Sequence, residues 1–339
     1  MLTIRAARAP GYYERQEFAR DDYYRERGEC PGQWVGRGAG ALGLAGAPRE
    51  GELGVLLEGR DPADGQVLAG GRGRPPSNAG FDVTFTAPKS VSVLAAVGED
   101  EVRRAVLAAQ EAGVRAGLDY LERTACLARR GRDGLTSVSA EGFAGAMFHH
   151  EMARSGDPHL HTHLVVANRV RAADGRWTAP DMRAVFHAAK TAGVVAEAVL
   201  REQLTERLGV EWGPVVNGTA ELAGMPEPVL AQFSGRHREI LAEAAARGWT
   251  SPRAISALQR ETRDHKPVID RERARADWRA QAAEHGLGRA EVDALLHHPR
   301  PAAPGVAQMR RLAERLAGPE GLTRQASTFT RGEVVQAFA

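Results

Sequence analysis

Cysteine is scarce in this sequence, with Cys30 and Cys126 as the only two in 339 residues. Neither is followed by a second Cys at the spacing of a ligand pair, which argues against a disulfide framework and a zinc-thiolate site. No apolar run approaches the roughly 18 residues of a membrane span, and MLTIRAARAPGYY lacks the apolar core of a signal peptide. The sequence therefore predicts a soluble, cytoplasmic protein without membrane insertion.

Lysine is also scarce, because Lys89, Lys190 and Lys266 are the only lysines among 45 Lys and Arg residues. The net charge of +2 is too small to indicate a partner by itself. Arginine's planar guanidinium suits bidentate contacts with phosphate, but a GC-rich genome would explain the same bias. With 43% hydrophobic and 26% charged residues, the chain has the composition of a globular protein of about two compact units.

Apolar periodicity predicts a mixture of strands and helices. FDVTFT at 81–86 alternates as a half-buried strand, and two further strands are predicted at about 136–150 and 159–171. Helices are predicted at 10–27, at about 99–130 and over FHAAKTAGVVAEAVLREQLTERLG, with a hairpin turn at Asn217-Gly218. Residues 226–298 have a helical pattern throughout.

The end of the sequence has a different composition. Residues 299–323 open with prolines and are expected to form a linker that carries one helix. In STFTRGEVVQAFA, Ser327 or Thr328 is expected to cap a further helix. We therefore expect the chain to be part of a longer protein.

Histidines are concentrated in GDPHLHTHLVVANRV, where His159, His161 and His163 occupy every second position. On a strand, His161 and His163 lie on one face with their Cα atoms about 6.5 to 7 Å apart, so that their rings can bind one ion. MFHHEMAR on the preceding strand offers His149 or His150 as a third ligand. Three neutral imidazoles leave the charge of a divalent ion free to polarise an anionic oxygen such as that of a phosphodiester.

Four of the five tyrosines form the adjacent pairs Tyr12-Tyr13 and Tyr23-Tyr24, eleven residues apart. Eleven residues are three turns of helix, so matching members share a face if one helix is continuous through both pairs. A phenol with a pKa near 10 becomes a nucleophile when a metal-bound phosphate attracts it and a base takes its proton. Packing residues are the alternative for the pairs, and activation of water is the alternative for a three-His metal.

Five motifs follow one another in the first 225 residues: YY...DDYY, W-x-G-x-G-A-x-x-LGL at 34–44, GFDVTFTAPKSVS at 80–92, F-x-HE at 148–151 and DPHLHTHLVVANR at 157–169. Together they resemble the F-type (MobF) conjugative relaxases of the HUH endonuclease superfamily. The resemblance implies an α+β fold, a palm of antiparallel sheet flanked by helices. It divides the chain into a catalytic palm (1–225), a helical fingers subdomain (226–298), and a linker with the start of a helicase domain (299–339).

The resemblance also implies an activity. Such an enzyme attacks one DNA strand at the nic site of a plasmid origin of transfer, leaves a 5′ phosphotyrosine and a free 3′ hydroxyl, and later rejoins the strand. Its partners would be single-stranded DNA with an adjacent hairpin, relaxosome proteins and a coupling protein, and it could enter the recipient cell with the DNA. The cofactor would be one divalent ion: Mg, Mn or Zn.

By resemblance, each site residue has a counterpart here. Tyr12 would be the first nucleophile and Tyr23 the second, with Tyr13 and Tyr24 as neighbours. The metal ligands would be His150, His161 and His163, with Asp82 as the acidic residue beside them.

Three positions near these residues are judged from the residues themselves. Asp82 lies on the polar face of its strand, where it could accept a ring N–H from a ligand His or take the tyrosine proton. His149 faces away from His150 and is expected to pack, whereas His159 shares the ligand face and could touch substrate or compete for metal. Thr162 departs from the apolar residue that the HUH name implies.

Weaker signals concern DNA binding. Lys89, Arg72 and Arg74 are predicted to contact DNA phosphates, with solvated side chains as the alternative. Trp34 is expected to be a core anchor rather than a platform for stacked bases. Three other functions stay open: a rolling-circle replication initiator, a non-catalytic origin-binding module with a structural metal, and a metallohydrolase that uses water.

Overall fold

The structure is a computed structural model that describes residues 1–7, 32–68, 78–131, 134–153, 155–251, 258, 271–300, 302, 304–319, 321–324 and 328–338. Its strands are β1 (Leu2–Ala7), β2 (Gln33–Val35), β3 (Gly80–Thr86), β4 (Leu127–Arg130), β5 (Thr136–Met152), β6 (Pro158–Ala172) and β7 (Trp177–Thr178). Its helices are α3 (Arg37–Ala41), α4 (Glu52–Leu57), α5 (Lys89–Val97), α6 (Asp100–Thr124), α7 (Met182–Leu208), α8 (Glu227–Gln232), α9 (Gly235–Ala246), α11 (Arg271–Glu284), α12 (Arg289–Ala294), α13 (Val306–Ala317) and α14 (Arg331–Phe338).

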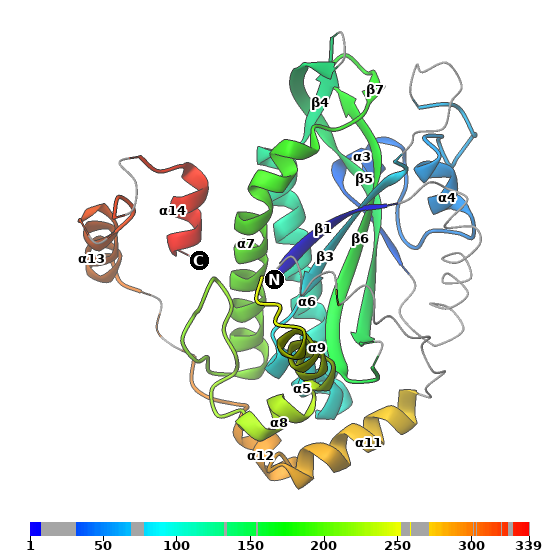
Figure 1. Ribbon diagram of the computed structural model, residues 1–339. Helices are drawn as coiled ribbons and strands as arrows, with labels where there is room; N and C mark the ends of the chain where they lie inside the picture. The colour runs from blue at the N-terminus through cyan, green and yellow to red at the C-terminus, as the bar shows by residue number, and fades with distance from the viewer. Residues whose placement is uncertain are drawn as a thin grey trace.

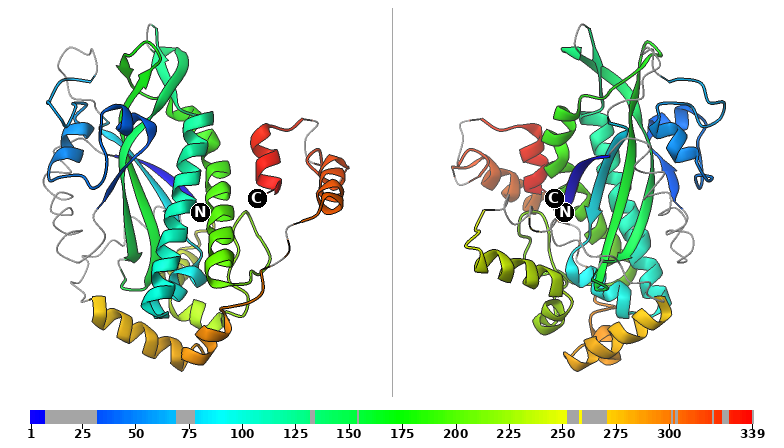
Figure 2. Two further views of the ribbon diagram at one scale, coloured as in Figure 1. Left: turned by 180° about the vertical axis from the view of Figure 1, so that it is seen from behind. Right: turned by 45° about the vertical axis from the view of Figure 1, so that its right-hand side comes forward.

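The strands form one seven-stranded sheet in the order β1-β3-β6-β5-β2, with β4 paired to β5 and β7 paired to β6. Every pairing is antiparallel. The long helices α6 and α7 lie side by side against one face, and the short helices α3 and α4 lie toward the other (Figures 1 and 2). The predicted α+β class, an antiparallel sheet flanked by helices, is confirmed.

Side-chain alternation explains why the sheet has two different faces. In β3, Phe81, Val83 and Phe85 are buried in the cluster that β3 shares with α6 and α7, while Asp82 is half-buried on the other face. In β6, Leu164 is 1% exposed and packs in the same cluster. Burying a leucine side chain contributes about 1.5 to 3 kcal/mol, and a slip of one residue would turn it away from the helices. The apolar pattern therefore fixes which residues face away from α6 and α7.

The predicted helix at about 99–130 is wrong at its end. α6 stops at Thr124, and Leu127–Arg130 forms strand β4, which pairs with β5. Ala128 in this strand is fully buried. The segment before the helix, KSVSVLAAV, forms the separate helix α5, which ends where the backbone of Gly98 becomes extended.

Helices α8 and α11, within residues 226–298, pack against α5. Phe233 and Trp278 are buried in one cluster with Val93 and Leu94 of α5. The boundaries predicted at 225/226 and 298/299 stay a proposal, since this cluster continues across the first of them. None of the helices that the structure describes is long and apolar enough to cross a membrane.

Two predicted turns and caps can be compared with the structure. The Asn217-Gly218 hairpin is confirmed, because both residues have positive φ (53° and 80°) and a β-bridge joins Val216 to Thr219. The cap predicted at Ser327 or Thr328 is wrong: α14 starts after Thr330, whose hydroxyl accepts from the backbone of Glu333 at 3.2 Å. Ser327 lies outside the described residues.

Candidate metal centre

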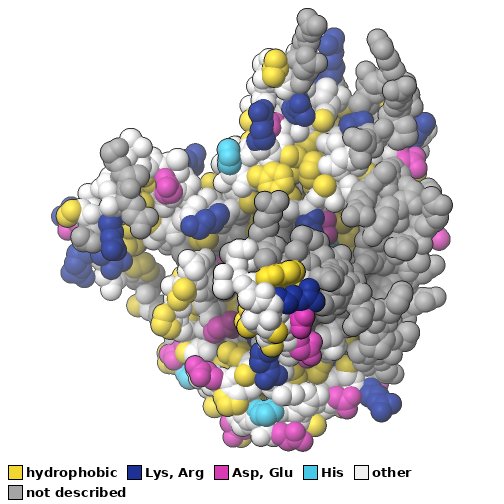
Figure 3. All heavy atoms as spheres, in the orientation of Figure 1, with side chains coloured by type: hydrophobic (Ala, Val, Ile, Leu, Met, Phe, Trp, Pro, Cys, Tyr) yellow, Lys and Arg dark blue, Asp and Glu magenta, His cyan; other side chains and the backbone are white. Residues whose placement is uncertain are grey.

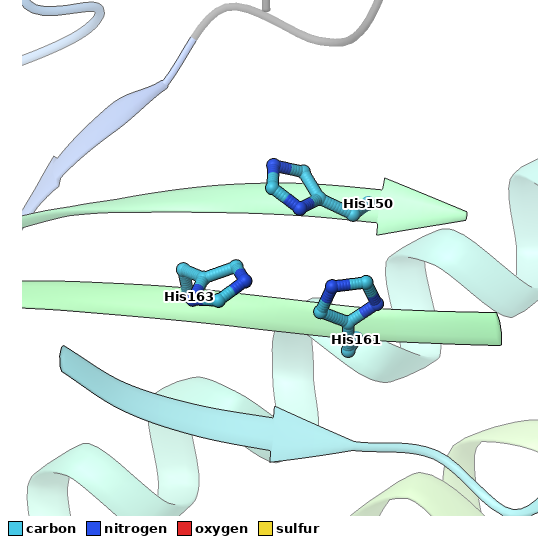
Figure 4. A group of neighbouring side chains, drawn as sticks. All are labelled: His150, His161 and His163. Carbon is cyan, nitrogen blue, oxygen red and sulfur yellow. The ribbon is translucent and has the colours of Figure 1, made fainter. Parts of the chain in front are cut away.

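Three histidines meet on the sheet face that points away from α6 and α7. His150 of β5 lies directly opposite His161 of β6 in the ladder, and His163 follows two residues later on the same face. Figure 4 shows the three rings on one side of the two strands. One ligand atom from each lies within 4.8 Å of the others, and the ring centroids are 4.9 to 5.1 Å apart. The structure therefore brings together the three residues predicted as metal ligands.

Hydrogen bonds define the orientation of two of these rings. His161 Nδ1 lies 2.8 Å from the carbonyl oxygen of His159, and His163 Nδ1 lies 2.9 Å from both carboxylate oxygens of Asp82. Because carbonyl and carboxylate oxygens only accept, both Nδ1 atoms carry the hydrogen, which leaves the lone pair on Nε2. This is the tautomer that a metal ligand needs, with its other nitrogen held by an acceptor. The donor set of three neutral imidazoles on two neighbouring strands fits one divalent metal ion.

Asp82 is the carboxylate of this centre. Burial favours a raised pKa for its carboxyl, but the electrostatic interaction with His163 and the hydrogen bonds from the ring and the hydroxyl around it outweigh burial, and the pKa is lowered overall. The Thr84 hydroxyl also donates to Asp82, at 3.1 Å. The carboxylate is therefore ionised at neutral pH and accepts the ring N–H of His163, which is one of the two contacts expected for it.

His149 faces α6, on the opposite side of the sheet from His150. Its Nδ1 lies 2.8 Å from the hydroxyl of Thr162, which is fully buried and also accepts from Gln110 Nε2 at 3.3 Å. The polar residue between the two ligand histidines thus has polar partners behind the sheet. The packing prediction for His149 is confirmed, but the sequence did not reveal the contact of Thr162 with Gln110, which lies 52 residues away from Thr162 in the chain.

His159 shares the face of the ligands, as predicted. Its ring centroid lies 4.9 Å from that of His161, but its ring nitrogens are not in the group of three. Burial, followed by the nearby charge of Lys89, lowers the pKa of His159 to about 4. His159 is therefore neutral at pH 7 and borders the centre.

Arg5 is a neighbour of the centre that the sequence reasoning missed. It lies on β1 directly across from Asp82, is exposed, and helps to lower the pKa of that carboxyl. β1 was not predicted as a strand, because its apolar pattern is short and its ladder partner β3 lies about 80 residues away. No local signal identified Arg5.

The predicted nucleophiles and two of the predicted DNA contacts cannot be placed. Tyr12, Tyr13, Tyr23 and Tyr24 lie in residues 8–31, and Arg72 and Arg74 lie in residues 69–77, all outside the described residues.

Lys89 is described, and its ammonium donates to the carbonyl oxygen of Pro158 at 2.8 Å. Burial lowers the pKa of this lysine, against the opposing charges of Asp157 and Glu221. Trp34 is 7% exposed within an apolar cluster, in agreement with its predicted role as a core anchor. On the face drawn in Figure 3, the described Lys and Arg side chains lie in several separate groups, at the upper end, around α13, near the middle and at the lower right.

Comparisons with known proteins agree with the geometry. Residues 6–285 match the family described as TrwC relaxase. The multifunctional conjugation protein TraI of Escherichia coli (strain K12) is 32% identical over 299 residues, which are 85% of this chain and 16% of TraI. The chain thus spans about a sixth of the length of this relative.

Solved structures of a similar protein cover most of the chain. A conjugative relaxase TrwC in complex with oriT DNA, described as copper-bound, superimposes with a TM-score of 0.73 at 30% identity, over 85% of this chain and 99% of that one. TrwC with a 27-mer DNA that comprises the recognition hairpin and the cleavage site gives a TM-score of 0.72 at 30% identity, with the same coverage.

Proposed function

The chain belongs to the TrwC relaxase family, and on this premise we propose that it nicks and rejoins one DNA strand at a plasmid origin of transfer. The observation that carries the proposal is the group His150, His161 and His163, whose ligand atoms lie within 4.8 Å of one another beside an ionised Asp82. We propose that these three histidines hold one divalent ion: Mg, Mn or Zn. When bound, the ion would polarise the scissile phosphate and stabilise the charge that develops on its oxygens.

The proposed nucleophile is Tyr12. Its phenol oxygen attacks phosphorus, the bond from phosphorus to the 3′ oxygen breaks, and the strand is left with a 5′ phosphotyrosine and a free 3′ hydroxyl. The phenol proton passes to a base, for which Asp82 is the carboxylate beside the centre, and the leaving 3′ oxygen takes a proton from water to become the hydroxyl. Tyr23 would act in the second step, with Tyr13 and Tyr24 beside the nucleophiles.

Covalent reach supports the assignment of Tyr12. It follows Ala7, the last residue of β1, by five positions, and five residues span at most about 18 Å. Ala7 pairs with Gly80, two residues before Asp82 on β3. The chain therefore tethers Tyr12 to the strand pair that carries the carboxylate of the centre.

The substrate and partners complete the proposal. The solved relatives described as bound to oriT DNA support single-stranded DNA with an adjacent hairpin as the ligand. Arg72 and Arg74 would contact its phosphates, and contacts with its unstacked bases would determine which DNA sequence is recognised. Relaxosome and coupling proteins, the helicase domain, the cytoplasmic location and passage to the recipient cell stay predictions.

The test detects the covalent intermediate. The protein is incubated with Mn²⁺ and a labelled pool of single-stranded oligonucleotides that carry origin-of-transfer sequences, and then denatured. We expect a labelled adduct that survives denaturation and disappears with EDTA, with Tyr12→Phe and with His163→Ala. Tyr120→Phe is the matched control, because Tyr120 lies on α6 behind the sheet and should leave the adduct unchanged.

Other products would point to other functions. A free 5′ phosphate without adduct would identify a hydrolase that uses water. Binding of the oligonucleotides without cleavage, unchanged by Tyr12→Phe, would identify an origin-binding module.

A further inference from the structure

The turn that joins β5 to β6, the two strands that carry the histidines, is hydrogen-bonded to helices outside the sheet. This ligand turn, defined as residue 153 with residues 155–158, follows His150 by three residues and precedes His161 by three. It is closed by two backbone hydrogen bonds, Ala153 N to Asp157 O at 2.9 Å and Gly156 N to Ala153 O at 3.1 Å. Gly156 has φ +88°, which favours glycine. Because the turn is short and both strands leave it directly, a shift of the turn moves ligands on both strands.

Helix α11 holds the ligand turn from one side. Trp278 donates its indole N–H to the carbonyl oxygen of Gly156 at 2.9 Å, and its side chain is 6% exposed. Figure 1 shows α11 lying across the end of the sheet where β5 turns into β6. α11 belongs to the helical region of residues 226–298, so this contact joins that region to the metal centre.

The same helix also holds α5. Arg279 donates to the carbonyl oxygen of Val97 at 2.9 Å, and Arg275 donates to that of Gly98 at 2.8 Å. These carbonyl groups lie at the C-terminal end of α5, where cations bind favourably. α11 therefore has a fixed position relative to α5.

Helix α5 in turn holds the other side of the ligand turn. At its first residue, Lys89 donates to Pro158 O at 2.8 Å, and Ser92 Oγ accepts from the backbone N–H of Leu160 at 2.9 Å. Pro158 and Leu160 flank His159, whose carbonyl oxygen orients the ring of His161. Hydrogen bonds thus link the turn to α11, α11 to α5, and α5 back to the end of the turn. We call this closed set of contacts the circuit.

We propose that α11 positions the metal ligands through this circuit, with Trp278 and Lys89 as positioning residues. A movement of α11 changes the position of Gly156, and with it the spacing of His150 from His161 and His163. Because coupling between two sites is reciprocal, binding of the ion also restrains α11. The inference deepens the proposed function and rests on it for its effect on nicking, but its effect on metal binding stands alone.

The first experiment measures metal affinity without DNA. Trp278→Phe keeps the ring in its apolar cluster and removes the N–H. By titration calorimetry with Mn²⁺, we expect binding about three- to tenfold weaker, less than the 10–100-fold effect typical of a residue that touches a ligand. The matched control is Trp212→Phe, which removes an indole N–H that is donated at 2.9 Å to Thr205 Oγ1 on α7 and not to the ligand turn. Its affinity should equal that of the unsubstituted protein.

The second experiment tests whether binding of the ion restrains α11 in return. It uses the unsubstituted protein, so its result does not depend on whether a variant folds. In the unsubstituted protein, saturating Mn²⁺ should slow backbone hydrogen exchange in residues 271–284, whereas exchange around Trp212 should not change. Lys89→Met should weaken Mn²⁺ binding in the same way as Trp278→Phe. A role for Lys89 in binding DNA phosphate would instead lower the salt slope of DNA binding by about 0.7 and leave metal affinity intact.

Three outcomes would overturn the inference. The first is unchanged Mn²⁺ affinity in Trp278→Phe and Lys89→Met, and the second is a loss of Mn²⁺ affinity in Trp212→Phe equal to that in Trp278→Phe. The third is a rate of hydrogen exchange in α11 that is the same with and without the ion. Failure of the proposed function is a separate result, because it would remove the covalent adduct while the metal measurements stood. If the inference holds, Trp278→Phe should lower kcat for adduct formation at fixed Mn²⁺ and leave KM for the oligonucleotide unchanged.

Discussion

Replacement of Asp82 by Asn tests how much the charge of one carboxylate contributes to the affinity of the centre for its metal ion. Both of its oxygens lie 2.9 Å from His163 Nδ1. Asn keeps the size of the side chain and can still accept the ring N–H through its one carbonyl oxygen, but it removes the negative charge that makes the imidazole a better donor. Loss of such a partner typically weakens metal binding by about 10- to 100-fold, which is about 1.4 to 2.7 kcal/mol.

The assay is titration calorimetry of Zn²⁺ or Mn²⁺ into the protein at pH 7.5, without DNA. The lowered pKa of Asp82 ensures that its carboxylate is ionised at this pH. Asp82→Ala removes charge and acceptor together, so its affinity should fall further than that of Asp82→Asn. Thr84→Val probes the surroundings of the carboxylate, since it removes the hydroxyl that donates to Asp82 at 3.1 Å and lies 3.3 Å from His163 Nδ1, and it leaves the carboxylate itself in place.

Equal affinity in Asp82→Asn and the unsubstituted protein would refute the reasoning, because the charge beside His163 would then have no effect on the ion. A different result would separate the two roles considered for Asp82. If nicking fell while metal affinity stayed constant, the carboxylate would act on the tyrosine proton rather than on the ligand ring.

Three further predictions concern stability. Thr162→Val should lower the free energy of unfolding in urea by about 1 to 3 kcal/mol, because it leaves the buried polar atoms of His149 and Gln110 without the hydroxyl they contact. Asp181→Ala should cost about 0.5 to 2 kcal/mol at pH 7, because Asp181 caps α7 through the backbone N–H of Arg183. Hydrogen bonding by the Arg183 side chain lowers the pKa of Asp181 to about 2, so this contribution is present above the unfolded pKa of about 3.9 and should vanish from urea curves as the pH falls through about 2. Removal of the ion with EDTA should lower the Tm in calorimetry, by an amount equivalent to about 2.7 kcal/mol if the ion was present at 100 times its Kd.

The sequence predicted those parts of the fold whose signal is local. Alternation identified β3 and β6, because one face of each strand packs on the helices and the other does not. The end of α6 could not be found in this way, since Leu127–Arg130 is a strand only by virtue of its pairing with β5. β1 and β2 were missed because they are short and their ladder partners lie far away in the chain. β7 was missed because it has only two residues, which pair with the end of β6 across a tight turn.

The same distinction explains which part of the metal centre was predictable from residues alone. His161 and His163 share a face through their spacing of two, which is a property of one strand. The choice between His149 and His150 as third ligand depends on the face that each residue presents on β5, and on the register of β5 against β6, in which His150 lies opposite His161. That register follows from the buried apolar faces, from the ligand turn with its left-handed Gly156, and from the irregularity between His150 and Met152 that shifts the pairing by one residue. A different turn length would place another side chain opposite His161, so the residues of the turn determine the ligand set although none of them belongs to it.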